Sequence, residues 1–132
     1  MAFTVPKGKV APVVTLEEIL KTRELVDRIH VDDKIRDYIV QVVVATRNPA
    51  KYKLDIKHLI QFGASPRATI NLTLAAKAWA LLEGRAYVTP QDVKNIGPDV
   101  LRHRLILTYE AEAEGVTTDN IVTKVLNTVP VP

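Results

Sequence analysis

The stretch from Gly63 to Gly84 places the strongest constraint on how this chain can fold. It begins Gly-Ala-Ser-Pro-Arg-Ala, continues as an apolar run and ends at a glycine. Ser65 is a suitable N-cap because its hydroxyl can accept a hydrogen bond from a free backbone N–H, and Pro66 at the first helical position has no N–H to leave unbonded. Gly84 suits the left-handed residue that commonly ends a helix. The stretch therefore predicts a helix of about 18 residues.

Apolar side chains occupy most of the circumference of this expected helix. Thr69, Thr73 and Lys77 recur at every fourth position and form one narrow polar stripe. A helix that is apolar all round lies in the middle of a bundle, and its alanines allow neighbouring helices to approach closely. The pattern predicts a mainly α fold, a small helical bundle around a central apolar helix.

Arg67 is an unexpected residue in the first turn of that helix. The positive end of the helix dipole disfavours a cation there by about 0.3–1 kcal/mol. An anion would explain the arginine, because free N–H groups and a guanidinium at one helix start form a phosphate site. The alternatives are an Arg67 that points into solvent or one that pairs with a carboxylate at the edge of the core.

Two helices are expected before the central one. Thr15 and Glu18 form a capping box that predicts a helix to about Arg28, with an inner side made of Leu16, Ile19, Leu20, Arg23 and Val26. Asp32 caps a second helix. The β-branched residues of 39–49 also suit a buried strand. We favour a helix there, because the periodic stretch that begins at Asp32 continues without a break.

The segments around the central helix are expected to be shorter. Residues 47–62 are interpreted as a long loop with a short turn of helix, and residues 85–88 as an extended link. Thr89-Pro90 begins a short helix that Gly97-Pro98 is expected to break. A helical turn then restarts over residues 99–105.

The C-terminal part is expected to contain one further helix. Residues 105–109 suit either a helix or a minor short β element, and Gly115 ends that piece. Thr117 caps a last helix through about Asn127, with four apolar residues facing inward: Ile121, Val122, Val125 and Leu126.

The chain of 132 residues has the size of one domain. Residues 1–14 contain Pro6, Gly8 and Pro12 and are interpreted as a linker or extended lead-in to a domain over 15–132. No apolar run is long enough to cross a membrane, and the start lacks the apolar core of a signal peptide. The chain has no cysteine, which fits a cytoplasmic protein.

The net charge of +3 comes from the first half of the chain, where residues 1–66 hold eleven Lys and Arg against eight Asp and Glu. This excess is milder than the footprint of a nucleic-acid-binding domain, so a nucleic-acid partner is not expected. A small basic helical DNA-binding module remains an alternative, and a protein-interaction bundle is a third.

Residues for catalysis or metal binding do not form recognisable motifs. A phosphate-binding loop requires Gly-Lys before Ser or Thr, and the only Gly-Lys, Gly8-Lys9, precedes Val10. His30, His58 and His103 are not at metal-ligand spacing. We expect no metal site, and we expect that the chain by itself is not an enzyme.

Four linked motifs resemble the C-terminal lid domain of MoxR-type AAA+ ATPases. They are Gly-Ala-Ser-Pro-Arg-Ala (63–68), Ala-Lys-Ala-Trp-Ala (76–80), Gly-Arg-Ala-Tyr-Val-Thr-Pro-Gln-Asp-Val (84–93) and Val-Leu-Arg-His-Arg-Leu (100–105). Their order is that of the family. The resemblance extends over about residues 15–132 and is strongest over 63–109.

The resemblance implies that Arg67 is the sensor-2 arginine, the catalytic residue that this domain contributes, and that Ser65 and Arg67 contact the nucleotide. It implies a larger parent ATPase that uses ATP with magnesium and performs chaperone-like remodelling or maturation of partner proteins. Its implied partners are an N-terminal AAA+ α/β module of the same protein, neighbouring subunits of a ring, and von Willebrand A-type domain proteins. Whether Arg67 serves its own subunit's ATP or a neighbour's stays open.

Arg85 and Asp92 flank Thr89-Pro90 in the third motif. We expect them to form an ion pair at the edge of the core that fixes the loop between two helices, because arginine and carboxylate commonly form such forked pairs. Contact with a nucleotide is the less favoured interpretation of these two residues.

Overall fold

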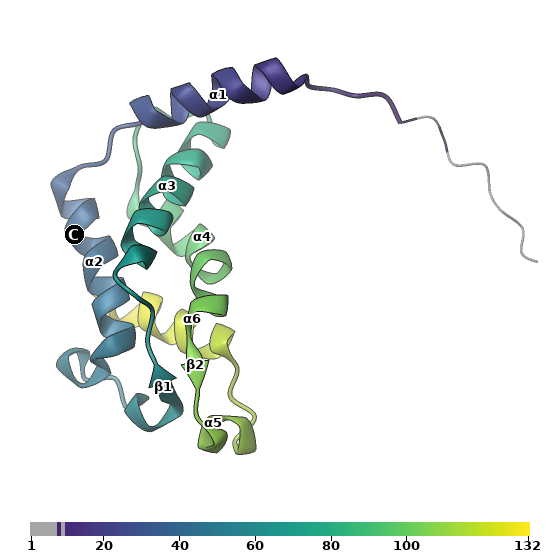
Figure 1. The fold of residues 1–132 in the computed structure, drawn as a ribbon. Helices are drawn as coiled ribbons and strands as arrows, with labels where there is room; N and C mark the ends of the chain where they lie inside the picture. The colour runs from purple at the N-terminus through teal and green to yellow at the C-terminus, as the bar shows by residue number, and fades with distance from the viewer. Residues whose placement is uncertain (1–7, 9) are drawn as a thin grey trace, which may run out of the picture.

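The structure is a computed structural model that describes residue 8 and residues 10–132 (Figure 1). These residues form six α-helices, one two-stranded sheet and three short 3-10 turns. The α-helices are α1 (Leu16–Arg28), α2 (Asp33–Arg47), α3 (Arg67–Leu82), α4 (Pro90–Leu101), α5 (Tyr109–Ala113) and α6 (Thr118–Thr128). The strands are β1 (Ile60–Phe62) and β2 (Ile106–Leu107), and the 3-10 turns are η1 (Pro49–Tyr52), η2 (Lys57–Leu59) and η3 (Arg102–Arg104). No helix of the described residues is long and apolar enough to cross a membrane.

Helix α3 is the centre of the bundle, as the sequence predicts. It contacts α1, α2 and α4, while α6 contacts both α2 and α4. It is not buried all round, however, and that part of the prediction is wrong. Its buried residues are a stripe of mostly small side chains at every fourth position, Ala68, Leu72, Ala76 and Ala80. Ile70, Leu74 and Leu82 remain exposed, because three neighbouring helices cover only part of its circumference.

Helix α1 has the predicted capping box between Thr15 and Glu18, but the prediction of its inner side is wrong. None of its residues is buried, and Leu16, Ile19 and Leu20 are exposed. The helix crosses the end of α3 (Figure 1), where the Lys77 side chain donates a hydrogen bond to the Asp27 carbonyl at 2.9 Å. Its apolar face therefore lies outside the core that the described residues form.

Helix α2 confirms the helical interpretation of the β-branched stretch. Asp32 caps it by accepting a hydrogen bond from the Lys34 backbone at 2.9 Å. Its buried face carries Tyr38, Ile39, Val42 and Val43. The helix ends at Arg47, where Asn48 forms the C-cap.

The loop expected over residues 47–62 contains two 3-10 turns and also a strand, which the sequence does not predict. Strand β1 pairs antiparallel with β2, with Ile60 opposite Leu107 and Phe62 opposite Ile106. The strand option for residues 105–109 is thus confirmed for Ile106–Leu107. Each strand is only two or three residues long, so neither leaves a clear alternating pattern in the sequence.

Helix α4 runs through Gly97 and Pro98, which contradicts the predicted break and the separate restart at Asp99. An interior proline costs about 3 kcal/mol through its missing N–H and its clash with the preceding turn. Packing outweighs that cost, since Val93, Gly97 and Leu101 are buried at every fourth position. Gly97 lies so close to α6 that an added Cβ would meet Leu126 at 3.0 Å.

The last helix agrees with the prediction. Thr117 forms a capping box with Asn120, and Gly115, with φ of +69°, ends the preceding piece. The four residues expected inward are all buried: Ile121, Val122, Val125 and Leu126. Of the expected lead-in, residues 1–7 and 9 lie outside the described residues, and residues 10–14 form no helix or strand. The division into lead-in and domain at residue 15 stays a prediction.

Candidate functional site

The start of α3 is fixed against the end of α2 by a close backbone approach. A Cβ on Gly63 would lie 2.4 Å from the Thr46 carbonyl oxygen, so only glycine fits there. The Thr46 hydroxyl accepts a hydrogen bond from the Ala64 N–H at 3.0 Å and donates to the Val43 carbonyl at 2.7 Å. Arg47 donates to the Ala64 carbonyl at 3.3 Å. These contacts fix the backbone three residues before Arg67.

Arg67 is the first residue of α3, and its side chain is exposed. No ion pair among the described residues includes it. The alternative in which Arg67 pairs with a carboxylate at the edge of the core is therefore wrong for the described part of the chain. Two interpretations of Arg67 remain: its guanidinium points into solvent, or it binds an anion from outside the described residues.

The hydroxyl of Ser65 does not cap α3, which corrects the prediction from the sequence. The N-cap position belongs to Pro66, whose φ of −54° and ψ of −28° are already helical, and no side chain caps the helix. The Ser65 carbonyl instead accepts a hydrogen bond from the Ala68 N–H at 2.8 Å. Because the turn closes through this backbone bond, the exposed Ser65 side chain is not engaged by the first turn.

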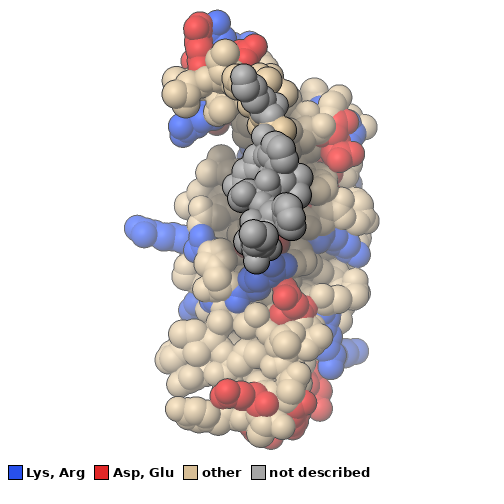
Figure 2. Space-filling view, turned by 90° about the vertical axis from the view of Figure 1, so that its right-hand side faces the viewer, with Lys and Arg blue, Asp and Glu red and all other residues tan. Residues whose placement is uncertain are grey.

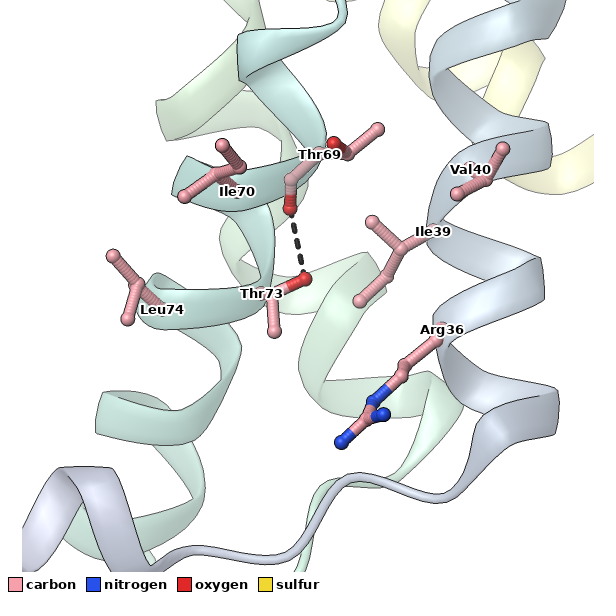
Figure 3. Close-up of a pocket in the computed structure, with 7 residues that line it drawn as sticks. All are labelled: Arg36, Ile39, Val40, Thr69, Ile70, Thr73 and Leu74. Carbon is pink, nitrogen blue, oxygen red and sulfur yellow. Dashed lines mark hydrogen bonds between the residues drawn. The ribbon is translucent and has the colours of Figure 1, made fainter.

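An apolar groove of about 300 Å³ lies between α2 and α3 (Figure 3). Ile70 and Leu74 of α3 and Arg36 and Val40 of α2 are among the residues that line it. Figure 3 shows Thr73 of α3 and Ile39 and Arg36 of α2 pointing into the space between the two helices. Ile70 is 61% exposed. Arg67, Ile70 and Leu74 follow the three- and four-residue spacing that places side chains on one face of a helix. The exposed guanidinium and the apolar groove therefore share one face of α3.

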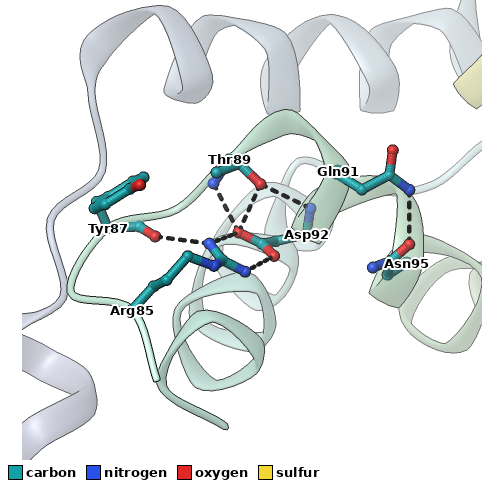
Figure 4. Close-up of polar contacts among 6 residues, drawn as sticks. All are labelled: Arg85, Tyr87, Thr89, Gln91, Asp92 and Asn95. Atoms are coloured by element: carbon teal, nitrogen blue, oxygen red, sulfur yellow. Dashed lines mark hydrogen bonds and ion pairs between the residues drawn. The ribbon is translucent and has the colours of Figure 1, made fainter. Parts of the chain in front are cut away.

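Arg85, in the link between α3 and α4, and Asp92, in the first turn of α4, form the ion pair that the sequence predicts (Figure 4). Both guanidinium Nη atoms of Arg85 contact the carboxylate, Nη1 at 2.8 Å from Oδ2. The Thr89 backbone N–H and hydroxyl donate to the same Oδ2 at 2.7 and 2.9 Å. Asp92 is 1% exposed, so this carboxylate is buried and fully engaged in structural contacts.

The pKa of Asp92 is lowered below its ordinary value of 3.8. Burial alone raises it, and the hydrogen bonds from Arg85 and Thr89 to the ionised carboxylate together outweigh that effect. The pKa of Arg85 is raised, mainly by its hydrogen bonds to Asp92. Both directions favour the charged pair.

The lowered pKa of Asp92 predicts a loss of folding stability in acid. A carboxyl group whose pKa is depressed in the folded state contributes stability that is fully present above its unfolded pKa, here near 3.8, and is lost as the pH falls through the folded pKa. We expect the urea midpoint of the chain to fall below about pH 4. Asp92→Asn should show a smaller decrease over the same range.

The difference in acid dependence between the parent chain and Asp92→Asn measures the contribution of Asp92. Hydrogen bonds from Thr15 also lower the pKa of Glu18, and that carboxylate adds the same acid dependence to both proteins. Equal acid dependence of the urea midpoint in the two proteins would contradict the role given to Asp92.

Thr46 and Gly63 position the site, although no sequence motif marks them as functional. Thr46 is a buried polar residue in the last turn of α2, and its partner Ala64 lies eighteen positions later. The sequence offers one weak sign of this contact, a threonine at a helix end followed by a glycine in an otherwise extended segment. The spacing of the histidines in the sequence predicts no metal site, but the structure brings His58 close to Glu110 and Glu114.

The sequence matches the AAA lid domain family over residues 53–125. It is 41% identical to the chaperone MoxR1 of Mycobacterium tuberculosis, with 100% of this chain and 35% of that protein covered. It is 37% identical to the protein MoxR of Paracoccus denitrificans, with 78% of this chain and 32% of that protein covered. The chain thus spans about a third of the length of the curated relatives it matches.

A solved structure is similar as well. The crystal structure of a putative ATPase from Cytophaga hutchinsonii superimposes with a TM-score of 0.84 at 41% sequence identity, and the match covers 88% of this chain and 36% of that chain. The matched family accounts for more than half of the residues, including α3, α4 and the link between them. The chain therefore belongs to the AAA lid domain family and matches about a third of the length of MoxR proteins.

Proposed function

We propose that this chain is the nucleotide-sensing lid of a larger ATPase and that Arg67 contacts the phosphates of bound ATP. The observation that carries the proposal is an exposed guanidinium at the start of α3 with no ion-pair partner in the described residues, next to a backbone segment that Gly63 and Thr46 fix. The dipole and N–H groups of a helix start favour an anion. The planar guanidinium of arginine suits phosphate oxygens. Ser65, also exposed, is proposed to lie against the same phosphates.

The remaining part of the ATP site is proposed to belong to an α/β module elsewhere in the same protein. That module would supply the phosphate-binding loop and the magnesium ligand, since neither motif occurs in this sequence. We propose that this module docks on apolar surface of the chain. The apolar groove between α2 and α3 supports this contact, and so do the exposed apolar side chains of α1. Contiguous exposed apolar surface commonly marks a contact with another domain or protein.

The mechanism follows from charge. ATP bound to the module attracts Arg67 through its γ-phosphate, and hydrolysis followed by phosphate release removes that attraction. The nucleotide thereby shifts the population of lid positions by its different contacts with each. A guanidinium on the transferring phosphoryl group also stabilises the transition state. Without the module, the chain is not expected to hydrolyse ATP.

The family supports further partners and a cellular role. We propose that the whole protein uses ATP with magnesium, forms a ring with neighbouring subunits, and remodels or matures partner proteins in the cytoplasm. Proteins with von Willebrand A-type domains are the proposed partner class. These proposals rest on the resemblance to the MoxR family, and the name of the chaperone MoxR1 supports the remodelling role.

The proposal predicts a separation between activity and stability at Arg67. In the full-length protein, Arg67→Ala is expected to lower the kcat for ATP hydrolysis at least about tenfold, because a transition-state contact is lost. In the 132-residue chain the same change should leave the free energy of unfolding unchanged or raise it by about 0.3–1 kcal/mol, because it removes a cation from the first turn of a helix. Steady-state ATPase assays and urea unfolding measure the two effects.

Arg102→Ala is the matched control. It removes another exposed guanidinium, which pairs within the domain with Asp99 at 3.1 Å and Asp119 at 3.0 Å. We expect the ATPase rate of this control to equal that of the parent protein. An unchanged kcat in the Arg67→Ala protein would remove Arg67 from the mechanism, and an equal loss in both variants would point to a general effect of charge.

A further inference from the structure

We propose that His58, Glu110 and Glu114 form a binding site for a divalent transition-metal ion of the Zn²⁺ class. Each residue offers one ligand atom, and these atoms all lie within 4.8 Å of one another. Imidazole nitrogen and carboxylate oxygen bind Zn²⁺ at about 2.0–2.2 Å, so the ligand atoms of one ion lie about 3–4 Å apart. The three side chains are exposed, and on binding an ion they would rotate to that closer spacing.

The backbone that carries the three residues is already in place. His58 lies in η2, Glu110 lies in α5, and Glu114 caps the end of α5. Thr108 joins the two segments, because its hydroxyl donates to the His58 carbonyl at 2.8 Å and its N–H donates to the Leu59 carbonyl at 3.0 Å. Metal binding would therefore order three side chains without moving the chain.

The charges around the site favour a cation. Glu110 and Glu114 are like charges four residues apart on one short helix, an arrangement that is unfavourable without a counter-charge. No ion pair with a lysine or arginine among the described residues includes either of them. Figure 2 shows acidic side chains gathered at the lower end of the molecule, where Figure 1 places α5. A divalent ion between the two carboxylates would relieve their repulsion.

The ligand types select the class of metal. A histidine nitrogen with two carboxylates suits Zn²⁺, Co²⁺ or Ni²⁺, whereas Mg²⁺ prefers oxygen ligands and retains several waters. Asp55 Oδ1 lies 3.9 Å from His58 Nδ1, beyond hydrogen-bond distance. A small rotation of these exposed side chains would let this carboxylate orient the imidazole, as outer carboxylates commonly do for metal-binding histidines. The site uses none of the residues proposed to contact ATP.

Calorimetric titration of the untagged 132-residue chain with Zn²⁺ tests the proposal. We expect saturable binding of one ion per chain that excess Mg²⁺ does not prevent. In NMR spectra the imidazole resonances of His58 should shift, while those of His30 and His103 stay unchanged. His58→Ala should weaken binding at least about tenfold.

Glu112→Gln provides a matched control on the same helix. It removes the same charge as Glu110→Gln or Glu114→Gln, but Glu112 is not among the three residues whose ligand atoms lie together. We expect Glu112→Gln to bind Zn²⁺ like the parent and the other two variants to bind at least about tenfold more weakly. Absence of saturable binding, parent-like binding by His58→Ala, or equal weakening in all three glutamine variants would overturn the proposal.

Discussion

Asp92→Ala is expected to lower the free energy of unfolding of the chain by about 3 kcal/mol, at the low end of the range for a buried ion pair that loses one partner. The carboxylate accepts hydrogen bonds from the Arg85 guanidinium and from both the N–H and hydroxyl of Thr89. Removing it leaves those donors without an acceptor at the edge of the core. The Arg85 side chain is 28% exposed and reaches water, which limits the loss.

Asp99→Ala on the same helix is the matched control for this prediction. Asp99 pairs with Arg102 at 3.1 Å, and its side chain is 62% exposed, so its loss should cost less than about 1 kcal/mol. Urea unfolding followed by circular dichroism compares the two variants. Similar midpoints for Asp92→Ala and Asp99→Ala would show that the buried pair contributes no more than a surface pair.

Local backbone chemistry explains which parts of the fold were predictable. The caps at Thr15, Asp32, Thr89 and Thr117 were all identified from the sequence. A capping side chain bonds to a backbone N–H only two or three residues away, so the residues that determine the helix start lie together in the sequence. The same locality made Gly84, with φ of +72°, identifiable as a helix end.

The Ser65 cap is a local prediction that is wrong, because the first turn of α3 closes through the Ser65 carbonyl instead. The other features that the sequence does not predict depend on distant residues. Pro98 does not break α4, because contacts with other helices outweigh a local preference. Strand β1 exists through its pairing with β2 more than forty residues later. The apolar period of α1 correctly indicated a helix with an apolar face, but periodicity does not say what covers that face. In the structure the face is exposed.

The candidate site was predictable in part for the same reason. Arg67 was identified because a cation in the first turn conflicts with the helix dipole, which is a local rule. Only the structure shows that no carboxylate of the described residues pairs with Arg67. His58 approaches Glu110 and Glu114 through the pairing of Thr108 with the His58 carbonyl, fifty residues apart. The spacing of histidines in the sequence carries no information about that contact.

The close approach at Gly63 leads to the second large expected effect. A Cβ there would lie 2.4 Å from the Thr46 carbonyl oxygen, 2.6 Å from its carbon and 2.8 Å from the Arg47 nitrogen. All three atoms belong to the backbone, so no side chain can rotate away and the segment before α3 must move. We expect Gly63→Ala to lower the free energy of unfolding by about 2–3 kcal/mol, as overpacking in a tight contact does.

Gly97→Ala is the matched control for Gly63→Ala. The three nearest atoms to its added Cβ all belong to the Leu126 side chain, the closest at 3.0 Å. Alanine favours a helix interior over glycine by about 1 kcal/mol. We therefore expect a small net change in the urea midpoint of this control. Because Gly63 lies four residues before Arg67, Gly63→Ala should also lower the ATPase rate of the full-length protein at temperatures where it remains folded. A Gly63→Ala chain as stable as the parent would mean that the start of α3 is not fixed by this contact.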